Sequence, residues 1–415
     1  MTLTELDKRT IALERAEELK GRIAPYLAAR EKVESGLALA AQFEQREQEL
    51  KEFFGATEEE WNDWHWQITN RVSDVGQLEQ LINLTPEEKK QIEEVGSHYR
   101  WAISPYYASL MSVNDSTCPI RMRAVPNIQE LLDVEGLADP MAEEYTSPAP
   151  RITRRYPDRL IINVTNQCGM FCRHCQRRRN IGEVDHPAED KDIEAALYYI
   201  RANPEIRDVL ITGGDPLTLE DEKIDWILSE LSSIPHVEVK RIGSATPVTL
   251  PQRITKELCD IFAKHAPLYI NTHFNHPKEV TPTAQAACFR LAKAGVALGN
   301  QTVLLRGINN DPYIMKKLCH DLLQALVRPY YIFHAKTVQG ATHFVTTVQD
   351  GLEIMENLRG YTSGLAIPWY IINAPEGHGK TPIVPQYLVS MGKDHVLIRN
   401  WEGKVFKYPN GFQQP

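Results

Sequence analysis

The feature that most constrains the fold of this chain is an alternation of short apolar runs and amphipathic segments between residues 160 and 333. The runs are rich in β-branched and aromatic residues, and the segments between them repeat apolar residues at helical spacing. Six such units imply parallel strands with right-handed crossovers, and hence an α/β fold with an open or closed barrel. The predicted strands are 160–165, 209–212, 239–242, 268–272, 302–305 and 330–333, with a further strand at 367–372, and the clearest helices are 190–200, 223–231, 282–294 and 312–325.

The rest of the chain surrounds this barrel pattern. Residues 1–100 are polar and rich in Glu, Gln, Lys and Ala, which predicts an N-terminal helical region. Prolines and turn residues in 101–154 indicate a connector with short helices. We therefore expect four regions: these two, the barrel core at 155–345, and a C-terminal extension at 346–415.

Composition excludes several classes of protein. The 415 residues are 42% apolar and 24% charged, as in a globular enzyme, and the formal net charge is -9. An acidic chain lacks the basic footprint that non-specific nucleic-acid binding needs. There is no run of eighteen apolar residues to span a bilayer, and residues 1–30 lack the features of a signal peptide. We expect a cytoplasmic protein with no nucleic-acid or membrane partner.

Three of the seven cysteines, Cys168, Cys172 and Cys175, fall within eight residues directly after the first predicted strand. Loops after strands carry the chemistry of such barrels, and three thiolates at this spacing can face one point. A tetrahedral zinc site would need a fourth ligand, for which only His174 is adjacent. A four-iron cluster held by three cysteines leaves one iron free to bind another molecule. We favour the cluster, with zinc as the alternative.

The C-x3-C-x2-C spacing after a first barrel strand resembles the signature of the radical S-adenosylmethionine (SAM) superfamily. Gly213, Gly214 and Asp215 end the second predicted strand and resemble the glycine-rich motif of that superfamily. The resemblance implies a partial (β/α)6 TIM-like barrel and a [4Fe-4S] cluster. It also implies that the open iron chelates SAM and that an electron cleaves SAM to a 5'-deoxyadenosyl radical. An electron donor such as flavodoxin or ferredoxin is then an expected partner.

A second segment with chemical potential is the glycine-rich stretch 373–382, which contains Lys380. On spacing alone this stretch is typical of a surface loop, and it lacks the first glycine of a phosphate-binding loop. A Schiff-base lysine needs access to a carbonyl cofactor and a pKa lowered by desolvation. Over residues 95–395 the chain resembles the lysine 2,3-aminomutase family, which carries pyridoxal phosphate (PLP) on a lysine followed by Thr-Pro, as Lys380 is here.

The same resemblance implies roles for further residues. Arg155 and Arg159 are expected to clamp the PLP phosphate, a task that suits the planar guanidinium fork. Arg177 is expected to bind the α-carboxylate of the substrate. Without the resemblance these arginines would be ordinary solvated charges. The residues implied as further cofactor contacts are Gly213, Gly214, Asp215, His174, Ser244 and Gln301, of which Ser244 and Gln301 could equally be ordinary strand-end polar residues.

Two positions depart from the lysine-specific members of the family, which place two aspartates around the ε-ammonium of the substrate. The matching residues here are Lys336 and Asn373. A buried ammonium facing Lys336 without its carboxylates would be strongly disfavoured, whereas a side-chain carboxylate could pair with Lys336 and accept from Asn373. The pair resembles that of the glutamate-specific members.

We therefore expect an isomerase that moves the amino group between C2 and C3 of a small amino acid, from L-glutamate to β-glutamate. The alternatives are a lysine 2,3-aminomutase and a non-enzymatic iron–sulfur or zinc-binding protein. Lysine-specific members often bind structural zinc between subunits through C-terminal cysteines, and no cysteine follows Cys319 here. That zinc site is expected to be absent, while a homo-oligomer stays open.

Overall fold

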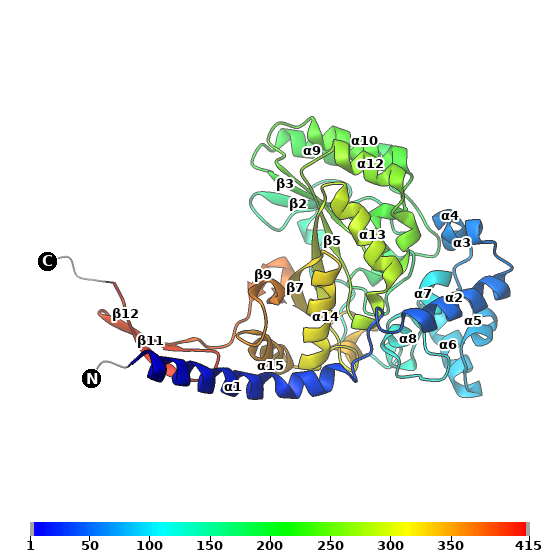
Figure 1. The fold of residues 1–415 in the computed structure, drawn as a ribbon. Coiled ribbons are helices and arrows are strands. Elements are labelled where there is room, and N and C mark those ends of the chain that lie inside the picture. The colour runs from blue at the N-terminus through cyan, green and yellow to red at the C-terminus, as the bar shows by residue number, and fades with distance from the viewer. Residues whose placement is uncertain (1–3, 412–415) are drawn as a thin grey trace.

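The computed structural model describes residues 4–411, and its centre is a curled sheet of nine strands in the order β1 to β9 (Figure 1). Strands β2 to β8 run parallel, and β1 and β9 pair antiparallel at the two edges. Each predicted strand overlaps an observed one, and the predicted partial barrel is confirmed. The strands are β1 Ile152–Thr153, β2 Arg159–Asn163, β3 Asp208–Thr212, β4 Val239–Gly243, β5 Leu268–Thr272, β6 Ala297–Leu304, β7 Arg328–His334, β8 Trp369–Ala374 and β9 Gly379–Pro382.

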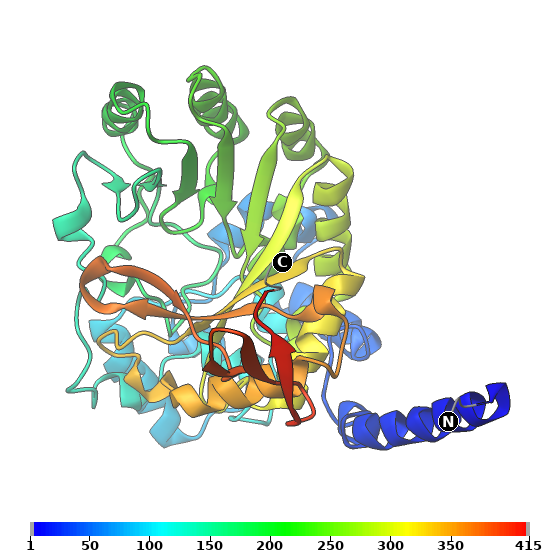
Figure 2. The ribbon, with the colours of Figure 1, turned by 90° about the vertical axis from the view of Figure 1, so that its left-hand side faces the viewer.

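Six long helices follow strands β2 to β7 in turn and cover one face of the curled sheet (Figure 2). Each presents an apolar stripe to the strands, as Ile193, Leu197 and Ile200 do in the first of them. Sequence periodicity predicted four of these helices. The six are α9 Asp190–Ala202, α10 Asp221–Ser232, α12 Lys256–Lys264, α13 Pro282–Lys293, α14 Pro312–Gln324 and α15 Val348–Leu358.

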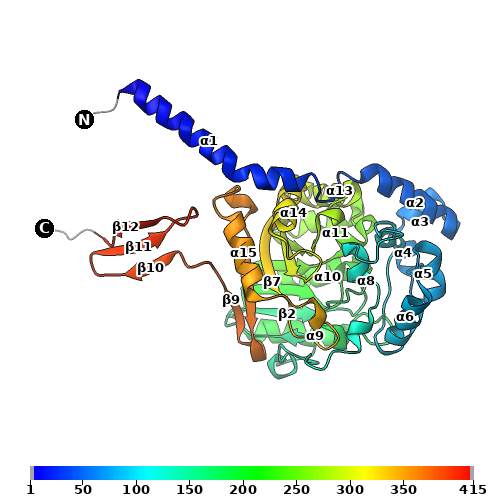
Figure 3. The same ribbon diagram turned by 90° about the horizontal axis from the view of Figure 1, so that it is seen from below.

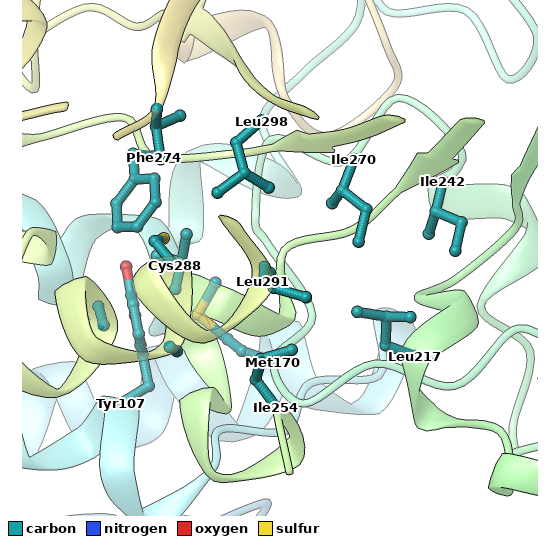
Figure 4. Close-up of a cluster of buried hydrophobic side chains, with 14 of the residues drawn as sticks. Tyr107, Met170, Leu217, Ile242, Ile254, Ile270, Phe274, Cys288, Leu291 and Leu298 are labelled. Carbon is teal, nitrogen blue, oxygen red and sulfur yellow. The ribbon is translucent and has the colours of Figure 1, made fainter. Parts of the chain in front are cut away.

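The core lies between the sheet and this helical layer. Figure 4 shows Ile242, Ile270 and Leu298 projecting from neighbouring strands toward the layer that contains Leu291 of α13. Along β2, β3 and β4 the burial alternates, so that every second side chain is fully buried against the helices. The intervening side chains face the inside of the curl and are only partly buried. The interior of the curl is therefore hollow, and it is where the site lies.

Seven other helices, formed by residues that precede the barrel in the chain, flank it. They are α2 Ala40–Phe54, α3 Glu58–Asn62, α4 Trp64–Thr69, α5 Val75–Leu81, α6 Pro86–His98, α7 Pro105–Ser109 and α8 Pro119–Ala124. The 26-residue helix α1, Glu5–Arg30, extends away from them (Figure 3). Across residues 4–411, no helix combines the length and the apolar character needed to cross a bilayer. The predicted region boundaries at 100, 154 and 345 stay predictions.

The C-terminal tail contains a small antiparallel sheet that sequence reasoning missed. It comprises β10 Leu388–Met391, β11 His395–Arg399 and β12 Val405–Pro409. Glu402, between the last two strands, pairs with Arg15 and Arg22 of α1 at 2.7 and 3.1 Å. These ion pairs join the two ends of the chain, which explains why α1 and the small sheet lie on the same side of the molecule in Figure 1.

The contact between α15 and β8 generates a stability prediction at Gly351. A methyl group added there would collide with the ring of Tyr370, which is fully buried and whose hydroxyl is held by His334 Nδ1 at 2.8 Å. Alanine favours a helix over glycine by about 1 kcal/mol, but overpacking a core costs about 1–3 kcal/mol. We expect Gly351→Ala to lower the thermal unfolding midpoint.

The matched control is Gly364→Ala, because a methyl group at Gly364 meets nothing within 4 Å. Circular dichroism melts of both variants and the parent check the prediction. A Gly351→Ala midpoint equal to that of the Gly364→Ala variant would show that α15 can move away from β8 at no cost.

Candidate active site

A cavity of about 270 Å³ occupies the interior of the curled sheet. Its wall includes Arg159 at the amino end of β2, Arg241 in the middle of β4, and residues of loops beyond the carboxyl ends of the strands. Of all the predicted site residues only Ser244 does not line it. The predicted residues that share the cavity are Arg155, Arg159, Cys168, Cys172, His174, Cys175, Arg177, Gly213, Gly214, Asp215, Gln301, Lys336, Asn373 and Lys380.

The loop between β2 and α9 presents Cys168, Cys172 and Cys175 to the cavity as free thiols. Among the described residues, no three Cys, His, Asp or Glu side chains converge on one metal ion. A four-iron cluster takes each thiolate on a different iron, so its ligands need not converge as zinc ligands do. Burial raises the pKa of the Cys168 and Cys172 thiols, so these ligands need the charge of a bound metal to ionise. The loop fits a cluster better than zinc.

A buried polar network contacts this loop at Cys172. Arg123 is fully buried, donates to Tyr107 Oη at 2.9 Å, and forms an ion pair with Glu279. Its Nη2 also lies 3.8 Å from Cys172 Sγ, within reach of a weak hydrogen bond to sulfur. Tyr107 donates to Glu279 at 2.6 Å and closes the network. Sequence reasoning missed Arg123 because it lies in the short helix α8, without a motif.

The glycine motif after β3 packs directly on the start of the cysteine loop. Gly213 has φ +138°, and a methyl group on either Gly213 or Gly214 would collide with the backbone of residues 165–167. The backbone N–H groups of Gly214 and Asp215 donate to Thr165 and Gln167 carbonyls at 2.5 and 2.7 Å. Only glycine permits this approach, which places the predicted SAM motif beside the predicted cluster.

The carboxylate of Asp215 is satisfied within the protein. It accepts from Ser244 Oγ and from the backbone N–H of Ala245, both at 2.7 Å. Burial raises the pKa of Asp215 despite these bonds. Ser244 is itself buried behind Asp215, so its contact in the structure is with the motif, and its role as a direct SAM contact stays a prediction.

Lys380 lies on the edge strand β9, opposite Asn373 of β8. Its amine lies 5.3 Å from the ring centre of Tyr156 and 5.9 Å from that of Phe333. The Lys380 backbone N–H donates to Tyr156 Oη at 2.8 Å, which ties β9 to the segment before β2. Desolvation, together with the charges of Arg159 and Arg155, lowers the pKa of Lys380 to about 7, although the side chain remains accessible from the cavity. With this pKa a substantial fraction of the amine is neutral near pH 7, and a reachable neutral amine is what a Schiff-base lysine requires.

Two guanidinium groups near this lysine have donors to spare. Arg159 stacks on the Tyr156 ring at 3.9 Å and pairs with no carboxylate among the described residues. Arg155 has a buried Nη1 without a hydrogen-bond partner. Buried, unpaired guanidinium donors are costly unless an anion binds them. Their position beside Lys380 fits the phosphate of PLP.

Lys336 and Asn373 present two more unpaired donors to the cavity. The amine of Lys336 lies 5.3 Å from the ring centre of Phe333 and forms no ion pair among the described residues. Desolvation, together with the charges of Arg177 and Lys380, lowers the pKa of Lys336 to about 7. The Nδ2 of Asn373 is buried and has no partner. An acceptor that reached both groups would satisfy them.

Glu143, which sequence reasoning missed, does not line the cavity itself but contacts the lining residues Arg155 and Arg177. It lies in the connector, is 6% exposed, and accepts from Arg177 Nε and Nη2 at 3.0–3.2 Å. Arg155 and Arg179 also contact it, at 3.5 and 3.3 Å. Burial opposes ionisation, but the arginines prevail and lower the pKa of Glu143. No local pattern around Glu143 signals this role.

Comparison with known proteins is consistent with this geometry. The family described as the radical SAM superfamily matches residues 162–314, and the family described as lysine-2,3-aminomutase matches residues 355–414. Glutamate 2,3-aminomutase of Clostridioides difficile is 56% identical over 401 residues, which cover 97% of this chain and 95% of that protein. The chain belongs to the 2,3-aminomutase family of radical SAM enzymes.

Other relatives of this aminomutase act on lysine by name. The L-lysine 2,3-aminomutase of Fusobacterium nucleatum is 50% identical over 360 residues, covering 86% of this chain and 85% of that protein. That of Bacillus subtilis is 48% identical over 353 residues, covering 85% and 75%. The chain is thus a radical SAM isomerase, and its family implies a [4Fe-4S] cluster, SAM and PLP as cofactors. The non-enzymatic alternative is overturned.

The cysteines and Lys380 come from different elements, the loop after β2 and the strand β9, so the two functions can be tested separately, first with Cys172→Ala. Two cysteines cannot hold a cluster with one open iron, so SAM cleavage should fall by more than the roughly 100-fold that loss of an outer-shell partner costs a metal site. PLP binding should persist, because Lys380 and the arginines are untouched. Quantifying 5'-deoxyadenosine under dithionite, alongside PLP absorbance, checks both. The control is Cys259→Ala in α12, outside the cavity, and SAM cleavage by the Cys172 variant would refute the ligand assignment.

The pKa of Lys380 generates a second prediction. The neutral amine captures PLP, so the rate of borohydride-trappable labelling of apo-enzyme should rise through pH 7 and level off above about pH 8; an ordinary lysine would keep gaining to above about pH 10. Lys380→Ala should lose the label, whereas Lys256→Ala, on the exposed face of α12, should keep it. Peptide mapping that marks another lysine, or a rate still rising at high pH, would contradict the assignment.

Proposed function

We propose that this aminomutase interconverts L-glutamate and β-glutamate (3-aminoglutarate) by moving the amino group between C2 and C3. The observation that carries the proposal is the pair Lys336 and Asn373, whose donors face the cavity without acceptors. A γ-carboxylate would pair with the ammonium of Lys336 and accept from the amide of Asn373. Binding the anion would also raise the pKa of Lys336 back toward its ordinary value.

The charges of the cavity disfavour lysine as the substrate. A lysine ε-ammonium beside Lys336 would face a like charge at a site that burial has already made costly for cations. Glu143, an anion close by, is already held by Arg177, Arg155 and Arg179. An ammonium would have to compete with those arginines, whereas a second carboxylate would not. The name of the Clostridioides difficile relative supports the same choice.

The residues of the chain act by binding and orienting. When bound, the cluster and SAM supply a radical, and PLP supplies a carrier for the migrating amino group. Arg177 would hold the α-carboxylate while Lys336 and Asn373 hold the γ-carboxylate. Fixing both ends of a five-carbon substrate also fixes the direction in which its C3 hydrogen points. The apolar ring of Phe333 lies within 6 Å of both lysine amines.

Partners and compartment follow from the same chemistry. We infer that an electron donor such as flavodoxin or ferredoxin reduces the cluster, and that the enzyme works in the cytoplasm. All seven cysteines are free, which is typical of a reducing compartment. We also infer a homo-oligomer, supported by the exposed apolar side chains on β10 and β12, namely Leu388, Met391, Val405, Phe406 and Tyr408.

Anaerobic incubation with SAM, PLP, dithionite and L-glutamate tests the proposed function. Amino-acid analysis should detect β-glutamate, and a parallel incubation with L-lysine should give much less β-lysine. A preference for lysine would establish the lysine 2,3-aminomutase alternative instead.

The pocket itself is tested by the double variant Lys336→Asp with Asn373→Asp. Each aspartate places a negative charge where the γ-carboxylate would end. Losing a buried charge-assisted pair costs about 2–5 kcal/mol, or roughly 30-fold to several-thousand-fold in kcat/KM for glutamate. The double variant should also gain weak activity on lysine. This gain should be smaller than the loss on glutamate, because the longer side chain of lysine also needs room.

The Lys336→Asp and Asn373→Asp single variants are the controls. In the Asn373→Asp variant the new carboxylate would pair with the remaining Lys336, and the Lys336→Asp variant has one carboxylate where the double variant has two. Neither single variant should therefore reach the lysine activity of the double variant. A double variant that keeps its glutamate activity would show that Lys336 and Asn373 do not read the substrate.

A further inference from the structure

Glu143 contacts two arginines that line the cavity, Arg155 and Arg177. It lies just before the single helical turn Glu144–Thr146, outside the barrel, and its carboxylate is almost completely buried. Arg177 donates to it through Nε and Nη2, and Arg155 lies 3.5 Å from it. One carboxylate therefore touches both the arginine expected at the PLP phosphate and the arginine expected at the substrate α-carboxylate.

Both arginines keep donors that Glu143 does not use. Arg155 has a buried Nη1 without a partner, and Arg177 engages Glu143 through the Nε edge of its fork, which leaves Nη1. A guanidinium is planar, so holding one edge fixes the direction of the other. A fork fixed in advance loses less conformational freedom when an anion binds.

The segment around Glu143 also packs against the glycine-rich loop that leads to Lys380. A methyl group on Gly377 would lie 3.0 Å from the Met141 carbonyl oxygen and 3.2 Å from Arg155 Cδ. Gly377 has φ +79°, so both its backbone angle and its surroundings require glycine. A continuous series of contacts thus joins the connector, Arg155 and Arg177, and the loop that leads to Lys380.

We propose that Glu143 is a positioning residue that orients Arg155 toward the PLP phosphate and Arg177 toward the substrate α-carboxylate. The second half of this inference rests on the proposed function, and the first half does not. If only the net charge of the cavity mattered, removing the carboxylate of Glu143 would make the cavity more cationic and would tighten anion binding. Loss of orientation and loss of charge therefore change the anion affinity in opposite directions.

Glu143→Gln in apo-enzyme, without SAM or reductant, tests this. PLP affinity is measured by absorbance titration, and glutarate, a dicarboxylate without an amine, is the calorimetric probe for the substrate site. Both affinities should fall by about 10-fold or more, the scale on which loss of an orienting partner acts. Glu143→Asp keeps the charge with a shorter reach, so it should weaken both less, and it replaces the Gln variant if that fails to fold.

The matched control is Glu130→Gln. Glu130 is equally buried and pairs with Arg173 and Arg178 of the same loop, neither of which lines the cavity. It should leave both affinities close to those of the parent. Equal losses in the Glu130 variant, unchanged affinities in the Glu143 variant, or tighter binding there would each overturn the proposal.

A double-mutant cycle separates this inference from the proposed function. In an Arg177→Met background, Glu143→Gln should cause no further loss of glutarate affinity but should still weaken PLP, because it acts through Arg155. A parent that binds PLP but not glutarate would refute the glutamate assignment, and the PLP measurements would still test Glu143. Additive losses of glutarate affinity in the cycle would refute the action through Arg177.

Discussion

The hollow interior of the curled sheet is the constraint on which the rest of the structure depends. In β2, β3 and β4 alternate side chains are buried against the outer helices, and those helices supply the hydrophobic burial that holds the sheet together. The inward side chains are then free of that task. Polar residues such as Arg159 and Arg241 can occupy inward positions because the space beside them is left open. A filled barrel of this size would have to replace them with apolar side chains.

An excess of positive charge in a partly enclosed space is the second constraint. Lys336 and Lys380 both have pKa values lowered to about 7, in each case by desolvation first and by neighbouring cations next. Glu143 supplies one compensating negative charge, whereas Asp215 uses its carboxylate within the glycine motif. The protein by itself leaves its cations under-compensated. Ligands that carry phosphate and carboxylate groups would complete the balance, so the electrostatics of the cavity favour anions.

Closure of the cavity depends on contacts between chain segments that are far apart in sequence. Tyr156 links the start of the barrel to β9 through the backbone of Lys380 and stacks on Arg159. Arg123 reaches the cysteine loop from the connector. These contacts hold Lys380 and the cysteine loop in the wall of one cavity, and they bring the connector into contact with that wall.

Local patterns in the sequence predicted the barrel and the grouping of the three cysteines in one loop, and the family resemblance pointed to Lys380. Strand–helix periodicity is local, and three cysteines within eight residues share one loop. Fourteen of the site residues expected from the sequence line one cavity, and their roles stay predictions. The contacts of Glu143, Arg123 and Tyr156, the position of Ser244 behind Asp215 and the strands of the tail are visible only in the folded chain. Several of these contacts join residues that are far apart in the chain, up to 224 positions for Tyr156 and Lys380. No local period or spacing records which distant segments become neighbours, because that is decided by how the whole chain packs.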